Sequence, residues 1–169
     1  MCLTSIKPLK KRKSILPIVA YKYVYDTTND RQCFAGPWFS SVDNKYGWVL
    51  HAKDLDYYSK GFGEYIKHLT VETHHQLGYN NKIYKVYDVN AGYHAYVYKR
   101  GQRILKNRYQ GVLHFVIIPP FTEYIKNNEG NTRFKTDIVA TRMIVCKDKK
   151  QLVRCYLLSL LGLNKISKQ

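Results

Sequence analysis

Residues 109–125, "YQGVLHFVIIPPFTEYI", contain the stretch that decides the fold. From residue 111 to residue 118 the side chains are almost continuously apolar, and a Pro-Pro pair ends the run. An apolar run of this length is typical of a central strand that is buried on both faces of a sheet. We therefore predict a strand over 111–118, followed by a turn.

Strands are also predicted on both sides of this run. Alternation of side-chain type favours strands over 15–25, 82–89, 92–100 and 136–146. In a straight strand over 136–146, one face would carry Ile138, Ala140, Arg142 and Ile144. The intervening "HQLGYNN", residues 75–81, is expected to be a loop because it is rich in turn-forming residues.

The C-terminal part predicts a helix over 148–161. Asp148 can cap its first turn, the stretch "CYLLSLLGL" is nearly continuously apolar, and Gly162 can end it. A helix with so many leucines has to be covered by its own sheet or by another subunit. The expected fold is α+β, a single domain that is mostly β-sheet with a C-terminal helix. Its expected parts are a basic N-terminal arm (1–14), the domain (15–163) and a tail (164–169).

The balance of charges is unusual. The 169 residues include 28 Lys and Arg against 12 Asp and Glu, a net charge of +16. A small soluble domain is well served by a net charge of roughly 2–8. The excess indicates a polyanionic partner such as nucleic acid, an acidic protein surface or an anionic membrane. The alternative is a composition bias, since Lys, Asn, Ile and Tyr are all abundant.

Residues 93–109 interleave cations with tyrosines, and the N-terminal arm is also basic. Cations neutralise phosphates and aromatic rings stack on bases, which is how many single-strand binders work. The alternative is a pair of strands with tyrosines in the core and lysines in solvent. The candidate nucleic-acid-binding residues are Lys10, Lys11, Arg12, Lys13, Tyr96, Tyr98, Lys99, Arg100, Arg103, Lys106 and Arg108.

No metal site, cofactor site or catalytic group is predicted. The spacing of His68, His74 and His75 matches no closed metal-binding pattern, and neighbouring histidines on a strand point to opposite faces. Carboxylates are scarce and do not converge, so we expect a protein that is not an enzyme and has no small-molecule substrate.

The cysteines and the apolar segments set further limits. Cys146 and Cys155 are expected to be reduced and buried, because the four cysteines form no disulfide or C-x-x-C pattern. The apolar run after the basic arm lacks a cleavage site and is not expected to be a signal peptide. No apolar segment is long enough to span a membrane.

The segment "VIIPPFTEYI" resembles the mono-ADP-ribosyltransferase pattern "V-L-I-P-P-F-x-x-F". In that family the catalytic glutamate directly precedes the first valine, and a Gln or Glu lies two residues earlier. The matching residues here are Phe115 and Leu113, which are apolar. The first strand offers only Lys22 where the family has Arg or His, and "GYHAYV" lacks the Ser-Thr-Ser of the middle strand. The resemblance therefore implies at most an inactive relative.

A broader resemblance covers roughly residues 1–145. The order of "PIVAYKYV", "GYHAY", "VIIPPFTEYI" and "DIVATRMIV" is similar to that in small uncharacterised proteins of Bacteroides-type bacteria and their crAss-like phages. Those proteins have no assigned reaction. The resemblance implies a viral protein of a bacteriophage, located in the virion or in the host cytoplasm.

Three functions remain open from the sequence. The first is a non-catalytic phage structural or assembly protein whose basic surface contacts partner subunits and nucleic acid. The second is a soluble nucleic-acid-binding or host-directed effector module. The third is an inactive ADP-ribosyltransferase-like domain. Apparent mass in solution and the salt dependence of nucleic-acid binding distinguish the first two.

Overall fold

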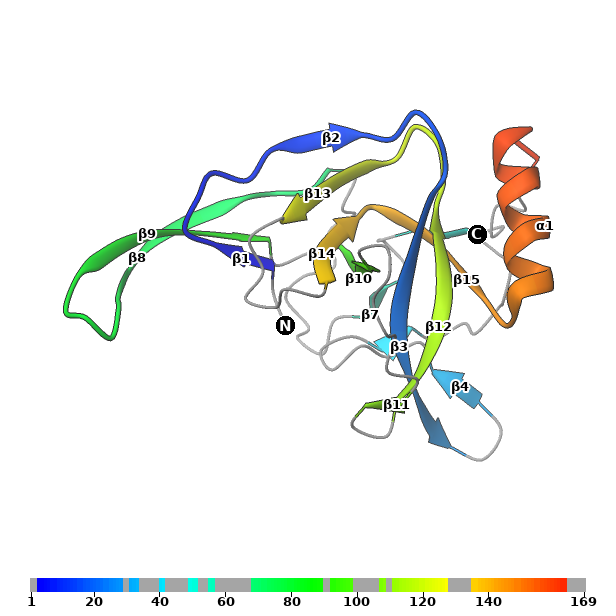
Figure 1. The fold of residues 1–169 in the computed structure, drawn as a ribbon, viewed down its shortest axis with the longest axis horizontal. Helices are drawn as coiled ribbons and strands as arrows, with labels where there is room; N and C mark the ends of the chain where they lie inside the picture. The colour runs from blue at the N-terminus through cyan, green and yellow to red at the C-terminus, as the bar shows by residue number, and fades with distance from the viewer. Residues whose placement is uncertain are drawn as a thin grey trace.

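The structure, a computed structural model, describes residues 3–28, 31–33, 40–41, 49–51, 55–56, 68–89, 92–98, 107–108, 111–127 and 135–163. Within these residues the fold is α+β, mostly strands with one C-terminal helix, as predicted (Figure 1). The elements are β1 (Leu3–Ser5), β2 (Lys11–Lys13), β3 (Ile18–Thr28), β4 (Arg31–Cys33), β5 (Ser40–Ser41), β6 (Val49–His51), β7 (Leu55–Asp56), β8 (Glu72–Leu77), β9 (Ile83–Val89), β10 (Tyr93–Tyr98), β11 (Asn107–Arg108), β12 (Gly111–Ile118), β13 (Glu123–Asn127), β14 (Lys135–Ala140), β15 (Arg142–Cys146) and α1 (Lys149–Leu160).

Five strands of the largest sheet enclose the main core. The main path of this sheet runs β2-β13-β14-β10-β3-β12-β15-β6, and in the chain only Thr141 separates β14 from β15. Because this bent strand pairs with β10 on one side and β12 on the other, the strands from β14 to β15 close into a small barrel. All five strands contribute to its buried interior, which consists of Ala20, Tyr93, Ala95, Val116, Ile118, Ile138, Ala140, Met143 and Val145.

The bend at Thr141 makes one prediction wrong. A straight strand would keep Ile144 on the face of Ile138, but Met143 and Val145 continue the barrel interior, and Ile144 lies in the cluster under α1. A single residue that leaves the ladder reverses the faces of everything after it. Side chains therefore alternate between the two faces on each side of the bend, but the residues that face the interior are even-numbered before Thr141 and odd-numbered after it.

The strand predicted from the opening stretch is confirmed. β12 lies between β3 and β15, and Val116, Ile117 and Ile118 are fully buried. Its two faces serve different layers, since Val116 and Ile118 fill the barrel while Ile117 packs under α1. This double burial is why the run is apolar without alternation.

The predicted helix is also confirmed, together with its caps. The Asp148 carboxylate accepts a hydrogen bond from the Gln151 N–H at 2.8 Å, and Gly162 follows the helix at a φ of 68°. One side of α1 packs on the outside of the barrel through Leu152, Cys155 and Tyr156. Cys146 and Cys155 are buried free thiols in this layer, as expected.

Residues 3–14 do not form the separate basic arm that the sequence predicted. β1 pairs with β9, β2 pairs with β13, and Leu3 is buried against Leu69, Val89 and Ile125. Main-chain hydrogen bonds and one buried leucine therefore attach this segment to two sheets. These short strands were not predicted because the segment is dominated by Lys and Arg and shows no apolar alternation. The predicted tail, 164–169, lies outside the described residues.

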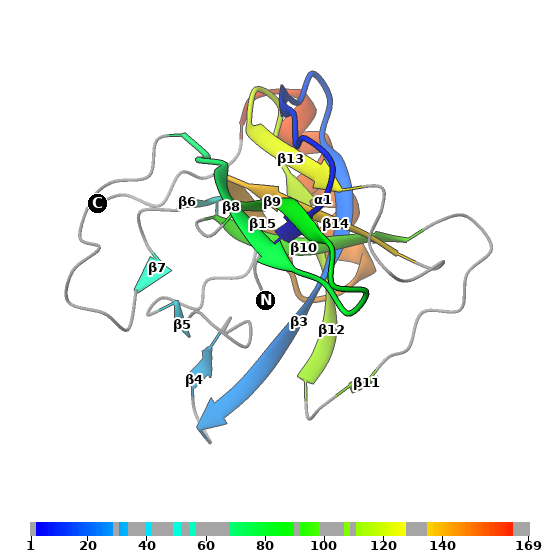
Figure 2. The same ribbon diagram turned by 90° about the vertical axis from the view of Figure 1, so that its left-hand side faces the viewer.

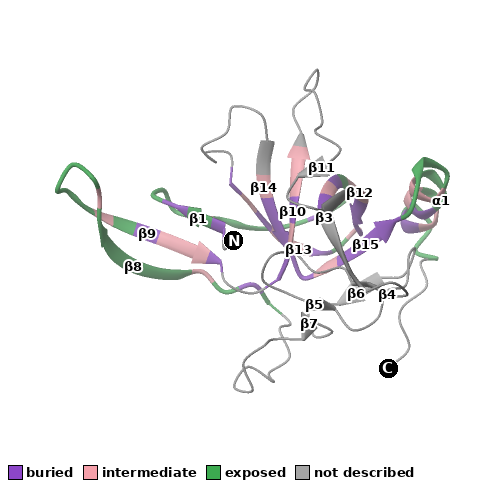
Figure 3. Cartoon of the chain, turned by 90° about the horizontal axis from the view of Figure 1, so that it is seen from below, coloured by how far each residue is buried: buried purple, intermediate pink, exposed green. Residues whose placement is uncertain are grey.

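β8 and β9 form a long hairpin that projects away from the barrel (Figures 1 and 2). The prediction of a loop over 75–81 was wrong in its first part, because β8 continues to Leu77. Every residue of β8 is exposed, so no apolar alternation marks the strand (Figure 3). The turn closes with Asn81 at a φ of 57°, and Gly78 leaves room for the ring of Tyr84, 2.7 Å from where a Cβ would lie.

Candidate nucleic-acid interface

The residues predicted to bind nucleic acid fall into three groups. Those that are exposed on or beside β2 are Lys10, Lys11, Arg12 and Lys13. Those placed in β10 or β11 are Tyr96, Tyr98 and Arg108. Tyr96 is half-buried and is paired in register with Tyr21. The side chains of Tyr98 and Arg108 are not among those described. Those outside the described residues are Lys99, Arg100, Arg103 and Lys106.

β2 is the edge strand on one side of the barrel sheet, and its three cations point into solvent. The carboxylate nearest in register belongs to Glu123, opposite Lys13. That carboxylate instead accepts a hydrogen bond from the Leu69 N–H at 2.6 Å and lies 3.3 Å from Nδ1 of His68. The positive charge of β2 is therefore presented to the surroundings.

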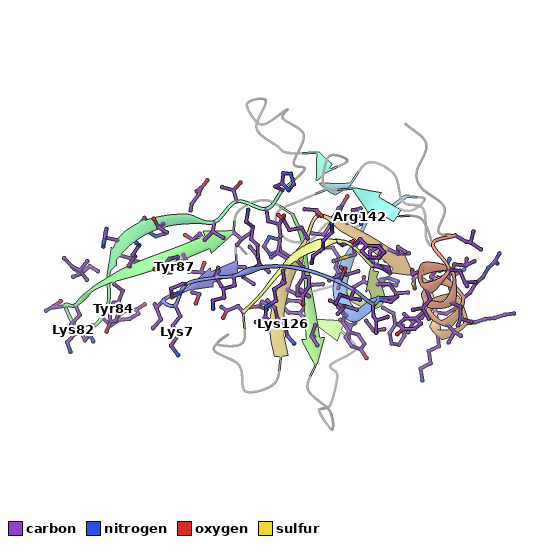
Figure 4. All side chains as sticks on the ribbon, turned by 90° about the horizontal axis from the view of Figure 1, so that it is seen from above. Lys7, Lys82, Tyr84, Tyr87, Lys126 and Arg142 are labelled. Carbon is purple, nitrogen blue, oxygen red and sulfur yellow. The ribbon has the colours of Figure 1, made fainter. Side chains whose placement is uncertain are left out.

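A second set of cations and rings lies along the hairpin. Figure 4 shows Lys82, Tyr84, Lys7 and Lys126 following one another from the hairpin tip toward the barrel. They come from the hairpin, from the segment after β1 and from β13, and the pairing of β1 with β9 brings these segments together. This set was not predicted from the sequence, although the alternation of Lys and Tyr in "KIYKVYDV" was a usable signal.

The rings of the hairpin differ in how they are held. Tyr79, at the tip, is fully exposed. The Tyr84 hydroxyl accepts a hydrogen bond from Nδ2 of Asn80 at 2.7 Å, and Nζ of Lys85 lies 5.6 Å from the centroid of the Tyr87 ring. Tyr84 and Tyr87 are thus fixed within the hairpin, whereas Tyr79 presents a ring on which a base can stack.

Two histidines pair with carboxylates. Nδ1 of His74 lies 3.2 Å from Oδ2 of Asp88, in addition to the pairing of His68 with Glu123. His75 points to the opposite face of β8 from His74, as alternation requires. In the described part of the chain, no three metal-ligating side chains come together. His74 and His68 therefore pair with carboxylates of β9 and β13.

Lys22 is a cation that does not contribute to the surface. It is buried, and its Nζ donates to the main-chain carbonyl oxygen of His94 at 3.0 Å. Burial lowers the pKa of Lys22 to about 8. Burial and then the charge of Lys22 lower the pKa of His94 to about 3, so that imidazole is neutral. Both groups belong to the interior and not to a binding surface.

The residues that match the catalytic positions of ADP-ribosyltransferases have packing contacts. Phe115 lies 5.4 Å from Tyr21, centroid to centroid, and packs against the cluster under α1. Leu113 is half-buried in the same strand. Glu123, the acid nearest in sequence, is held by Leu69. At these positions an aromatic contact takes the place of a carboxylate.

Among the described residues, no helix has the length and apolar character needed to cross a membrane. No family model, no curated protein and no solved structure matches the chain. Function is therefore inferred from the charged and aromatic surface itself.

Proposed function

We propose that this protein is non-catalytic and binds nucleic acid, as a structural or assembly protein of a phage in the virion or the host cytoplasm. The observation that carries the proposal is the succession of Lys82, Tyr84, Lys7 and Lys126 from the hairpin tip to β13 (Figure 4). The phage setting is supported by the resemblance of residues 1–145 to phage and Bacteroides-type proteins.

The line of side chains suits a nucleic-acid strand for two reasons. Lysines spaced along a ribbon can each neutralise a phosphate of an extended backbone and release its counterions. The exposed ring of Tyr79 at the hairpin tip can stack on a base without regard to sequence, because every base has an aromatic face. The hairpin projects from the barrel, so a strand can lie along its length (Figure 1).

The variant Lys7→Glu/Lys82→Glu/Lys126→Glu tests the proposal. We expect its affinity for a fluorescent single-stranded oligonucleotide to fall at least about tenfold. The slope of log K against log salt should become shallower by about 2, because each lost phosphate contact removes about 0.7. The measurement is fluorescence anisotropy across a series of salt concentrations, with a duplex of the same sequence as a second probe.

The matched control reverses three other exposed lysines, Lys147, Lys149 and Lys150, at the start of α1. This helix lies at the other end of the molecule from the hairpin (Figure 1). The control removes the same net charge and is expected to retain most of the affinity. Equal losses in both variants would mean that net charge alone drives binding, and the hairpin proposal would be wrong. A third variant, Arg100→Glu/Arg103→Glu, tests the stretch that the sequence predicted.

Tyr79→Ala removes the exposed ring at the hairpin tip. Stacking on one aromatic ring contributes about 1–3 kcal/mol to single-strand binding. We therefore expect a loss of affinity of about five-fold or more that persists at high salt, because stacking does not release counterions. Thermal stability should stay unchanged, because the side chain makes no buried contact. An unchanged affinity would exclude Tyr79 from the interface.

The mass in solution distinguishes a structural or assembly protein from a soluble binding module, the first two functions predicted from the sequence. An assembly component is expected to form a species larger than one chain with or without nucleic acid, whereas an isolated binding module stays a monomer. Light scattering coupled to size-exclusion chromatography gives this mass directly. A monomer with strongly salt-dependent binding would favour the module.

A further inference from the structure

Two turns at one end of the barrel are locked together around Ser14. Ser14 is buried, and its hydroxyl donates to the Pro119 carbonyl oxygen at 2.6 Å and accepts from the Thr122 N–H at 2.9 Å. Its main chain donates to the Thr122 carbonyl oxygen and accepts from the Phe121 N–H at 2.7 Å. The turn after β2 and the turn after β12 therefore form one rigid unit.

This unit presents apolar side chains to solvent. Ile15 is 79% exposed, Leu16 61% and Phe121 69%. A single exposed apolar residue needs no explanation, but three large ones on one rigid unit form a patch of the kind found at interaction sites. We name Ile15, Leu16 and Phe121 the apolar tip.

Phe121 is held in an unfavourable backbone conformation. Its φ is 57°, in the left-handed region that bulky residues rarely occupy and that Gly, Asn or Asp adopt at less cost. The ring is exposed, so this phenylalanine does not gain core packing in return. A strained and exposed aromatic residue indicates that the side chain is retained for a contact outside the molecule.

The C-terminal end of α1 also presents apolar side chains. In Figures 1 and 2 this end of the helix lies on the same side of the molecule as the two turns. The exposed leucines at this end are Leu160, Leu161 and Leu163. Three segments of the chain therefore present exposed apolar side chains on this side of the molecule.

Cations border this surface. Lys11, Arg12 and Lys13 are exposed on β2, which leads directly into the apolar tip. The register partner of Lys13 is Glu123, whose carboxylate is held by Leu69. A second copy of the chain on this surface would bring its own β2 cations close to Lys11, Arg12 and Lys13. Repulsion between these like charges, and between two chains of net charge +16, disfavours such a dimer. An anionic, extended and apolar partner fits both features.

We propose that the apolar tip and the helix end insert into the headgroup region of an anionic lipid bilayer, with the cations of β2 on the lipid headgroups. Apolar side chains that enter the boundary between headgroups and acyl chains, combined with basic residues at the surface, bind anionic membranes without spanning them. This contact uses a different surface from the hairpin, so it neither requires nor excludes nucleic-acid binding.

The variant Phe121→Asn tests the insertion at constant charge. We expect its binding to phosphatidylcholine vesicles containing phosphatidylglycerol to weaken at least about tenfold, as for the loss of one buried aromatic side chain. Its midpoint of thermal unfolding should be equal to or higher than that of the wild type, because asparagine tolerates a positive φ. Lower stability together with unchanged vesicle binding would show that the ring is structural and would overturn the proposal.

Two further measurements separate insertion from simple charge attraction. Compared with the wild type, which already holds Trp38 and Trp48, Phe121→Trp should show additional blue-shifted emission with these vesicles, and lipids brominated on the acyl chain should quench that added emission. The matched control is Ile83→Asn, which removes an equally exposed apolar side chain from the hairpin and should leave vesicle binding unchanged. A tryptophan at 121 that is not quenched, or equal losses in both Asn variants, would contradict insertion.

Self-association and the nucleic-acid proposal are tested on the same Phe121→Asn variant. Its affinity for the single-stranded oligonucleotide should equal that of the wild type, so that either proposal can fail without the other. If the wild type forms a dimer that Phe121→Asn dissociates, and bromolipids do not quench the tryptophan, the apolar surface binds a second copy and the lipid proposal is wrong.

Discussion

Replacing Gly92 with alanine is expected to lower the free energy of unfolding by about 3 kcal/mol or more. Gly92 has a φ of 125°, which alanine adopts only with strain. An added Cβ would also lie 2.6 Å from Cγ1 of Val139 and 2.8 Å from Cδ2 of Leu69, and both of those side chains are fully buried. Because the core around them is packed, neither has space into which to move. Urea unfolding followed by circular dichroism measures the change.

Gly162→Ala provides the matched control for this prediction. Gly162 also has a positive φ, 68°, but an added Cβ would meet nothing within 4 Å. We expect it to lose only about 1 kcal/mol, the cost of the left-handed conformation. The difference between the two variants isolates the steric contribution at Gly92. Equal losses would show that the contact between β10, β14 and Leu69 is looser than the structure indicates.

The second large effect concerns the buried Lys22 and its dependence on pH. The folded-state pKa of Lys22 is about 8 against 10.5 for an exposed lysine, because burial disfavours the charge. Below pH 8 both the folded and the unfolded state hold the proton, so the penalty is present in full, about 3 kcal/mol. Between pH 8 and 10.5 only the unfolded state keeps the Lys22 proton. The free energy of unfolding therefore rises with pH over this range, as the penalty for burying the charge is removed.

Lys22→Met removes the charge while keeping a long apolar side chain. Below pH 8 we expect the variant to be more stable than the wild type by about 2 kcal/mol, since the gain of about 3 is offset by one lost hydrogen bond to His94. Above pH 10.5 the order should reverse by about 1 kcal/mol, because the wild-type amine is then neutral and still donates. Titrating groups that do not interact with Lys22 cancel in the difference between the two proteins, and His94, whose pKa the charge of Lys22 lowers, titrates well below this pH range. Parallel stability curves would contradict the assignment of Lys22 to the interior.

The parts of the fold that were predicted correctly are those in which the residue types themselves indicate burial or a helix end. The run over 111–118 is apolar because both of its faces are covered, and Asp148 and Gly162 mark the helix ends through local chemistry. The face of Met143 was missed because the bend at Thr141 is a tertiary feature, set by pairing with two different strands. β8 was missed because all of its side chains are exposed.

The candidate interface was predicted in part. Lys10 to Lys13 are adjacent in sequence, so their shared exposure could be expected before any fold was known. Lys7, Lys82 and Lys126 come from three separate segments, and only strand pairing and the packing of the hairpin place them in line (Figure 4). Long-range juxtapositions of this kind leave no local pattern in a single sequence.

The bent strand of β14 and β15 also determines when the barrel can form during synthesis. β3 lies near the start of the chain, yet the barrel that contains it closes only through residues 135–146. A chain emerging from the ribosome therefore exposes β3, β10 and the apolar β12 until residues 135–146 have been made. During that interval the outer edges of β10 and β12 lack the partners that β14 and β15 supply, and unpaired edges of this kind favour wrong pairing with other chains.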